Sequence, residues 1–438
     1  MKLGRWILLA IAAITVIGAV SAGCRGGHDD GRRGNVRALP ESSCPTPIVY
    51  GGDGDPAYLI ASDLPLQNPS LPQTAQMGKA IAFILMEHGF KAGDKRVAYQ
   101  SCDDSTAQAA SWDSARCTAN ANAYAANATL IGIVGTYDSG CAKFVIPVLN
   151  TKRIAMVSPT NTYAGLTQGG PVAPGEPGKY FPSGRRNYAR VIAADNVQGP
   201  ALATFARRDL KLSKIFVLDD GQRYGAGVAN GFTSAAAKLG LTIAGSRAWS
   251  PKAAGYTELA TIIKRSGADG VLVSGIVDNH GGKLLKDLRA VLGARIAIMA
   301  PDGFTPVESV VTVAGGAAEH LYVSLAGPPA DRLTGRGKSF VDAFGATVGG
   351  PEKVTADAAY AAQATEVLLD AIAASDGSQA SVAEKLSATN VTDGIMGSFT
   401  IDANGDTTRG AMSIFQIEKG KQSIVTVVAP DPDTVPKG

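Results

Sequence analysis

Short hydroxyl and amide side chains gather just after two apolar, strand-like segments of the sequence. They are Thr136, Tyr137 and Ser139 after residues 130–135, and Ser158, Thr160, Asn161 and Thr162 at the end of residues 154–158. Several neutral donors of this kind can share the charge of one carboxylate, and the dipole of an adjacent helix N-terminus adds to the attraction. The same residue types also form turns and cap helices, so the residues alone leave both interpretations open.

A carboxylate follows a later strand-like segment. Asp302 stands in the sequence Ala-Pro-Asp-Gly-Phe at residues 300–304, directly after an apolar run. An ammonium needs a carboxylate at short range, whereas hydroxyls and amides suit a carboxylate. If these strand ends meet in space, the residues predict a binding site for a zwitterion such as an amino acid.

The sequence does not indicate a hydrolase, a cofactor enzyme or a nucleic-acid-binding protein. The chain has four histidines and lacks the GxSxG, SxxK and HExxH patterns that activate a serine or bind zinc. The glycines at 225, 227 and 231 have the wrong spacing for a dinucleotide loop. Lys plus Arg number 41 against 38 Asp plus Glu, and no basic run with interleaved aromatics occurs. We therefore expect no catalytic activity, no cofactor, no metal and no nucleic-acid partner.

Strand-like and helix-like segments alternate along most of the chain. Apolar runs of strand length near residues 95–100, 130–135 and 154–158 are separated by segments with apolar residues at helical spacing, such as residues 74–90. This alternation predicts parallel sheets covered by helices on both faces. It restarts after a loop rich in glycine and proline, residues 169–184, so the predicted fold class is α/β with two doubly wound parallel-sheet lobes. Ligands of such sheets bind beyond the carboxyl ends of the strands, which places the polar residues at a cleft.

The first residues have the features of an export signal, and we assign residues 1–23 to a signal peptide. A basic start precedes an apolar run, residues 6–20, that is shorter than the ~20 residues of a membrane-spanning helix. Ser-Ala-Gly-Cys, ending at Cys24, resembles a bacterial lipobox, so we expect lipid attachment at Cys24; an ordinary signal peptide is the alternative. Residues 24–44 are predicted to be a flexible tether. The protein is thus expected to be lipid-anchored to the cell membrane, facing the periplasm or cell exterior.

The remaining cysteines agree with an oxidising compartment. Cys44, Cys102, Cys117 and Cys141 are an even number, and they allow three disulfide pairings that the sequence leaves open. We favour Cys102 with Cys141, because each lies just past a predicted strand and the ends of neighbouring parallel strands lie close together. That choice leaves Cys44 with Cys117 as the second pair. No CxxC or paired His/Cys spacing supports a zinc site instead.

Six segments resemble, in order and approximate spacing, type I periplasmic binding proteins of the branched-chain amino-acid class. They are ASDLPLQ, GTYDSGCA, SPTNTYAGLT, NVQGP, LDDGQRYGAG and APDGF, and the resemblance covers about residues 45–427. It implies a substrate-binding lipoprotein that captures leucine, isoleucine or valine between two lobes and delivers it to the membrane permease of an ABC transporter. We expect such a protein to act as a monomer.

The resemblance also implies roles for individual residues. Ser139 and Thr162, with Asn161 beside them, stand where the family binds the carboxylate of its ligand. Asp302 stands where an acidic residue of the family binds the amino group, although its side chain is one methylene shorter. The similarity therefore gives the zwitterion interpretation of these residues more weight than the turn and capping interpretation.

Three further residues complete the predicted ligand-binding set. Tyr224 matches a tyrosine that closes over the ligand, and Tyr137 lies at the mouth of the first lobe. Ile276 stands where the family often has a second tyrosine, so this wall is aliphatic or the ligand differs. An amide, a urea-like solute or an aromatic acid on the same scaffold is therefore an alternative ligand, and ligand sensing is an alternative to transport.

The family fold implies a hinge with three chain crossings, which we place near Asp195, Gly327 and Met396. Each lobe is then built from separated segments. The first lobe would comprise residues 45–195 and 328–395, and the second lobe residues 196–327 and 396–430.

Overall fold

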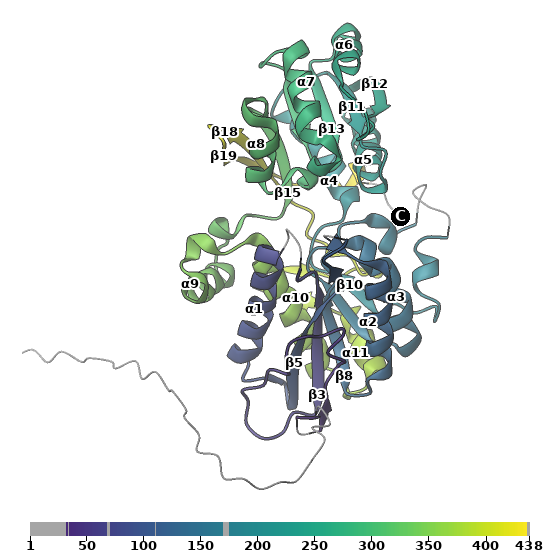
Figure 1. The fold of residues 1–438 in the computed structure, drawn as a ribbon, viewed down its shortest axis with the longest axis vertical. Helices are drawn as coiled ribbons and strands as arrows, with labels where there is room; N and C mark the ends of the chain where they lie inside the picture. The colour runs from purple at the N-terminus through teal and green to yellow at the C-terminus, as the bar shows by residue number, and fades with distance from the viewer. Residues whose placement is uncertain (1–31, 34, 68–70, 110, 170–174, 436–438) are drawn as a thin grey trace, which may run out of the picture.

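The computed structural model describes the chain from residue 32 to residue 435, apart from residues 34, 68–70, 110 and 170–174. The predicted signal peptide and Cys24 lie outside the described residues. Within the described ranges, no helix is both long enough and apolar enough to cross a membrane. The chain forms two lobes that follow one another along the long axis of the molecule (Figure 1).

The first lobe is built on a six-stranded sheet that is parallel except for one edge strand. In spatial order its strands are β10 (Tyr188–Arg190), β9 (Ala155–Ser158), β8 (Leu130–Gly135), β3 (Tyr58–Leu64), β5 (Lys95–Asp103) and the antiparallel β4 (Lys91–Ala92). One face is covered by α1 and α10 and the other by α2 and α3 (Figure 1). The helices of this lobe are α1 (Leu71–Glu87), α2 (Ser114–Ala126), α3 (Ser139–Lys152), α9 (Arg336–Val348), α10 (Ala356–Ala373) and α11 (Gln379–Leu386).

The second lobe is built on a seven-stranded sheet. Its strands are β12 (Thr242–Ala248), β11 (Lys214–Asp219), β13 (Gly270–Ser274), β14 (Ala297–Ala300), β15 (Leu321–Ala326), β18 (Met412–Glu418) and β19 (Lys421–Val428), of which the first five are parallel. A C-terminal hairpin, β18 and β19, extends the sheet in the antiparallel direction. The helices are α4 (Asp195–Arg208), α5 (Arg223–Leu239), α6 (Thr257–Ser266), α7 (Gly282–Leu292) and α8 (Val307–Ala314).

The predicted fold class is confirmed, and the local sequence explains why. Gly-Val-Leu-Val-Ser, the whole of β13, is buried at every position, as expected for a strand covered by helices on both faces. Thr355 caps α10, because its hydroxyl accepts a hydrogen bond from the Ala358 N–H at 3.2 Å. Gly240 ends α5 in a left-handed conformation at φ +69°. Three short two-stranded ladders complete the fold: β1 (Arg32–Arg33) with β2 (Val36–Arg37), β6 (Ser105–Thr106) with β7 (Ser111–Trp112), and β16 (Asn390–Val391) with β17 (Phe399–Thr400).

The chain passes between the lobes three times, and the third passage differs from the prediction. The first passage joins β10 to α4 and the second follows β15, where Gly327 adopts φ +63° and its N–H donates to the Ala411 carbonyl at 2.9 Å. We predicted the third passage near Met396. Residues 399–408 instead stay on the first lobe, since β17 pairs with β16 and the Arg190 N–H donates to the Gly405 carbonyl at 2.9 Å. The third passage therefore follows residue 408.

The predicted tether of residues 24–44 is too long. Val36 and Leu39 are buried, at 0% and 3% exposure, and the Leu39 N–H donates to the Gln100 side chain at 2.8 Å. Residues 35–44 thus pack on the first lobe instead of forming a free linker. Burial of two aliphatic side chains explains this outcome, because each contributes about 1.5–3 kcal/mol when it is removed from water.

All four cysteines that we expected to be bonded form disulfides, but the favoured pairing is wrong. The bonds join Cys44 to Cys102 and Cys117 to Cys141. The segment before β3 runs antiparallel beside β5, which brings Cys44 to Cys102. Cys141 lies in the first turn of α3, which packs on α2, the helix that contains Cys117. The second bond therefore joins two helices on one face of the sheet.

Candidate functional site

A cleft of about 800 Å³ is lined by residues of both lobes. The first lobe contributes the loops after β8 and β9 and the start of α10, and the second lobe contributes the loops after β13 and β14 and the start of α5. These segments meet because the carboxyl ends of parallel strands lie at one edge of each sheet. The cleft therefore has the location that the strand order predicts.

The first-lobe wall contains three of the predicted ligand-binding residues. Tyr137, Ser139 and Thr162 all line the cleft. Ser139 is the first residue of α3, and its hydroxyl accepts a hydrogen bond from the Tyr163 N–H at 3.3 Å. The N-terminal turn of α3 supplies a favourable dipole for an anion beside these hydroxyls, and the Asp138 carboxylate at the N-cap opposes part of that attraction. This wall can therefore bind a carboxylate.

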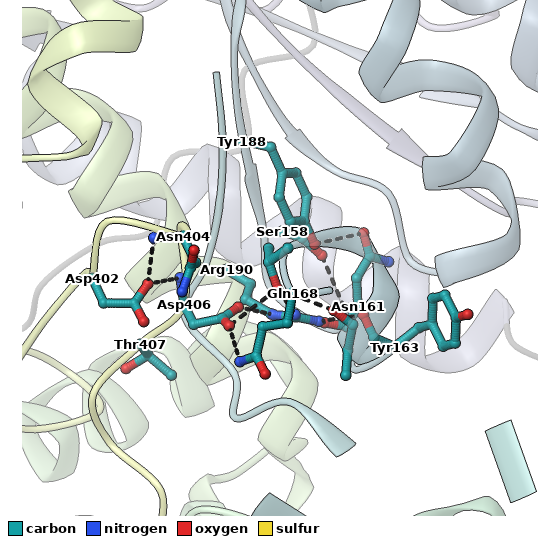
Figure 2. A network of polar contacts seen from close by, with 12 residues as sticks. Ser158, Asn161, Tyr163, Gln168, Tyr188, Arg190, Asp402, Asn404, Asp406 and Thr407 are labelled. Atoms are coloured by element: carbon teal, nitrogen blue, oxygen red, sulfur yellow. Dashed lines mark hydrogen bonds and ion pairs between the residues drawn. The ribbon is translucent and has the colours of Figure 1, made fainter. Parts of the chain in front are cut away.

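Asn161 does not line the cleft, contrary to the prediction. Its buried side chain donates to the carbonyl oxygens of Thr136 and Tyr137, both at 3.0 Å, and accepts from the Tyr188 hydroxyl at 3.2 Å. Its own carbonyl accepts from Arg190 at 2.9 Å. Figure 2 shows Asn161 inside this network. Asn161 thus holds the loops after β8 and β9 together, and Thr162 beside it faces the cleft.

The second-lobe wall carries the predicted ammonium partner. Asp302 follows β14, and its carboxylate accepts a hydrogen bond from the Tyr224 hydroxyl, which in turn accepts from the Gly303 N–H at 3.0 Å. Burial raises the pKa of Asp302, and hydrogen bonds from Tyr224 and Gln198 oppose that rise. Gly303 permits this close packing, because a Cβ there would lie 2.3 Å from the Gly275 carbonyl oxygen. A partly buried carboxylate held in this way can bind an ammonium.

Ile276 lies at the rim of the cleft and is 38% exposed. Its position depends on Asp220, whose carboxylate accepts from the Ile276 N–H at 3.2 Å and from the Asn279 side chain at 2.8 Å. Asp220 is itself buried, at 1% exposure. An aliphatic side chain therefore lines the cleft at this position and is partly open to solvent, and its contact with a ligand stays a prediction.

Several residues of the cleft were not among the predicted ligand-binding residues, and three of them bear directly on its chemistry. Asp138, Asp357 and Tyr360 all line it. Burial raises the pKa of Asp138 to about 6, and burial followed by the charge of Asp302 raises the pKa of Asp357 to about 6. Asp138 is adjacent to Ser139, so the same strand-end argument could have included it. Asp357 and Tyr360 lie in α10, far along the chain from the other first-lobe residues, and no local pattern marks them.

A family model and proteins of known function match this chain. A family model described as periplasmic binding protein matches residues 70–422. The leucine-, isoleucine-, valine-, threonine- and alanine-binding protein of Pseudomonas aeruginosa is 25% identical over 287 residues, which cover 66% of this chain and 71% of that protein.

Solved structures share the fold. A leucine-binding protein from Thermotoga maritima superposes with a TM-score of 0.69 at 22% identity, covering 86% of this chain and 99% of the other. A solute-binding protein of an ABC transporter from R. palustris, in complex with benzoate, superposes with a TM-score of 0.64 at 18% identity, covering 85% and 97%. The family match spans more than half of the chain and includes every residue of the cleft named above. The chain belongs to the periplasmic binding protein family, whose members bind solutes and are not enzymes.

Proposed function

We propose that this protein is an exported lipoprotein that captures an α-amino acid between its lobes and delivers it to an ABC permease. The observation that carries the proposal is the division of the cleft into two chemistries. Ser139 and Thr162 on the first lobe suit a carboxylate, and Asp302 on the second lobe suits an ammonium. A ligand with both groups contacts both lobes, so it stabilises the closed arrangement relative to the open one.

The names of the relatives set the first ligands to test. The Pseudomonas aeruginosa relative is named for leucine, isoleucine, valine, threonine and alanine, and the half-exposed Ile276 supports an aliphatic contact. Selectivity among such side chains depends on the shape of the pocket, where one methylene contributes only about 1–3 kcal/mol. The branched-chain preference expected from the sequence therefore stays a prediction.

Isothermal titration calorimetry tests the proposal. The purified protein is titrated at pH 7.5 with the twenty amino acids, urea, acetamide and benzoate. We expect at least one α-amino acid to bind, and Asp302→Asn to weaken that binding by at least about 30-fold, because a buried charge pair loses one partner. Asp342→Asn, which removes an exposed carboxylate on α9, is the matched control and should bind as the parent does.

Two results count against the proposal. Binding of benzoate or an amide with no response to any amino acid would remove the zwitterion argument and leave only the cleft. Equal binding by the Asp302→Asn variant and the parent would show that Asp302 does not bind the ammonium of the ligand.

Anchoring is tested separately, by mass spectrometry of the protein purified from membranes. We expect a diacylglyceryl modification on Cys24 and its loss in Cys24→Ala, together with release of the protein from the membrane fraction. If the protein is instead found outside the membrane fraction with Cys24 unmodified, the first residues are an ordinary signal peptide without lipid attachment.

A further inference from the structure

The lining of the cleft carries an unbalanced charge. Seven of its residues are Asp or Glu, and none of the described lining residues is Lys, Arg or His. Four of the seven are exposed at the rim, whereas Asp138, Asp302 and Asp357 are partly buried. An α-amino acid with an uncharged side chain has no net charge, so it would leave two of these three carboxylates without a cation.

Asp357 is the carboxylate that the proposed function does not use. It lies in the first turn of α10, on the first lobe, across the cleft from Asp302. No hydrogen bond or ion pair joins its carboxylate to another described residue, and burial and the charge of Asp302 together raise its pKa to about 6. The N-terminus of α10 would otherwise attract an anion, but Asp357 places a negative charge there. The start of α10 therefore suits a cation, whereas Ser139 and Thr162 elsewhere on the same lobe suit a carboxylate.

Other residues of the cleft also favour a positively charged ligand group. Burial raises the pKa of Tyr137, and the charges of Asp357, Asp138 and Asp302 raise it further, so all three carboxylates act on one phenol that lines the cleft. Tyr137, Tyr224 and Tyr360 line the cleft beside them, and aromatic faces attract organic cations. Arg409 acts on the Tyr360 phenol but is not among the lining residues.

A buried carboxylate also lies beside Thr162, one of the residues that line the cleft. Asp195 is 3% exposed, and its backbone N–H donates to the Thr162 carbonyl at 2.8 Å. Neither oxygen of its side chain has a hydrogen-bond partner of ordinary geometry in the described structure, although the nearby Thr162 hydroxyl opposes the rise in its pKa. Burial first, and then the charge of Asp302, raise the pKa of Asp195 to about 7. An unpartnered buried carboxylate beside the lining makes the interior of the cleft more favourable for positive charge.

We infer that the natural ligand carries a second cationic group, and that this group binds Asp357 while the α-ammonium binds Asp302. The inference rests on the proposed function for the zwitterionic end of the ligand and adds the chemistry of its side chain. The ligand class is therefore a diamino acid or another amino acid with a cationic side chain, in place of the aliphatic side chains for which the relatives are named. A diamine without a carboxylate shares the cationic chemistry and is distinguished by the experiment.

The test is a calorimetric comparison of lysine, ornithine, arginine, leucine and cadaverine with the full-length parent protein at pH 7.5. We expect a cationic amino acid to bind at least about 10-fold more tightly than leucine. We expect Asp357→Asn to weaken binding of the cationic amino acid by about 10- to 100-fold, while leucine binds at least as tightly as before because the variant removes a carboxylate that leucine leaves without a cation. Protonation of Asp357 should weaken cationic binding at pH 5 in the parent more than in the variant. Asp342→Asn is again the control, and melting temperatures show that each variant is folded.

The outcomes separate this inference from the proposed function. Leucine binding as tightly as every cationic amino acid, or Asp357→Asn weakening lysine and leucine alike, overturns the inference and leaves the amino-acid function standing. Cadaverine binding more tightly than lysine supports the second cationic group but overturns the zwitterion argument. Absence of binding by all five compounds overturns the inference as stated.

Discussion

Removing the Asp406 carboxylate should destabilise the protein far more than removing an exposed one. Arg190 is fully buried, and its Nε donates to the Asp406 carboxylate at 2.7 Å (Figure 2). The same guanidinium donates to the carbonyls of Asn161 and Tyr163, both at 2.9 Å. Asp406→Ala leaves a buried cation without its counter-ion, which costs about 3–5 kcal/mol. Asp342→Ala, which breaks an exposed pair with Lys338, should cost at most about 1 kcal/mol.

Urea unfolding at pH 7.5, followed by circular dichroism, measures this difference. A double variant, Arg190→Met with Asp406→Leu, removes both charges and should recover most of the lost stability, because apolar replacements of a buried pair are often neutral. Two results would refute the reasoning. One is an Asp406→Ala cost no larger than that of Asp342→Ala, and the other is a double variant no more stable than Asp406→Ala.

The pH dependence of this pair has a defined sign. Burial acts to raise the pKa of Asp406, but the charge and hydrogen bond of Arg190 and the bonds from Gln168 and Thr167 hold it below its usual value. A carboxyl with a lowered pKa stabilises the fold above its unfolded pKa, near 3.9, and that contribution is lost as the pH falls through the folded value. The Asp406→Ala penalty should therefore shrink below about pH 4.

Two other predictions concern stability. Burial raises the pKa of Asp195 to about 7, so its ionisation should reduce the free energy of unfolding by up to about 4 kcal/mol as the pH rises from 4 to 8. In urea unfolding at several pH values, Asp195→Asn should lose most of this decline. Equal declines in the variant and the parent would contradict the raised pKa of Asp195. The Cys44–Cys102 bond spans 58 residues and should contribute about 4 kcal/mol by restricting the unfolded chain, against about 3 kcal/mol for the Cys117–Cys141 bond, which spans 24. Replacing Cys44 and Cys102 together by serine should therefore lower the melting temperature more than replacing Cys117 and Cys141 together. The opposite ranking would count against the entropic account.

The fold was predictable because its signals are local. Strand-length apolar runs alternate with helical spacing in both lobes, and each run is short enough to assign without tertiary information. The disulfides and the third passage depend on contacts that are distant in sequence. Cys44 lies in a segment without apolar periodicity, and Asp406 reaches Arg190 across 216 positions. The hydrophobic pattern along the chain does not predict which distant residues pair with each other.

The candidate site divides in the same way. Ser139, Thr162 and Asp302 follow strands, so the topology rule places them at the cleft. Asn161 also follows a strand, but its side-chain amide donates hydrogen bonds to backbone carbonyls. The direction of this side chain depends on its rotamer, which its position in the sequence does not specify. Asp357 lies in α10, which the chain forms after its second passage between the lobes. Its raised pKa comes from burial and from the charge of Asp302, which are not visible in the local sequence.

The carboxylates also bear on how closure would depend on a ligand. Asp302 belongs to the second lobe and Asp357 to the first, so movement of the lobes toward each other brings two negative charges together in a partly dehydrated cleft. The repulsion grows as water leaves, because the effective dielectric constant falls. A ligand with positive charge placed between the two walls reverses the sign of this contribution, whereas an empty cleft retains it. Under the proposed function, the same residues that recognise the ligand therefore disfavour closure without it, and charge contributes to the difference in binding free energy between the open and closed states.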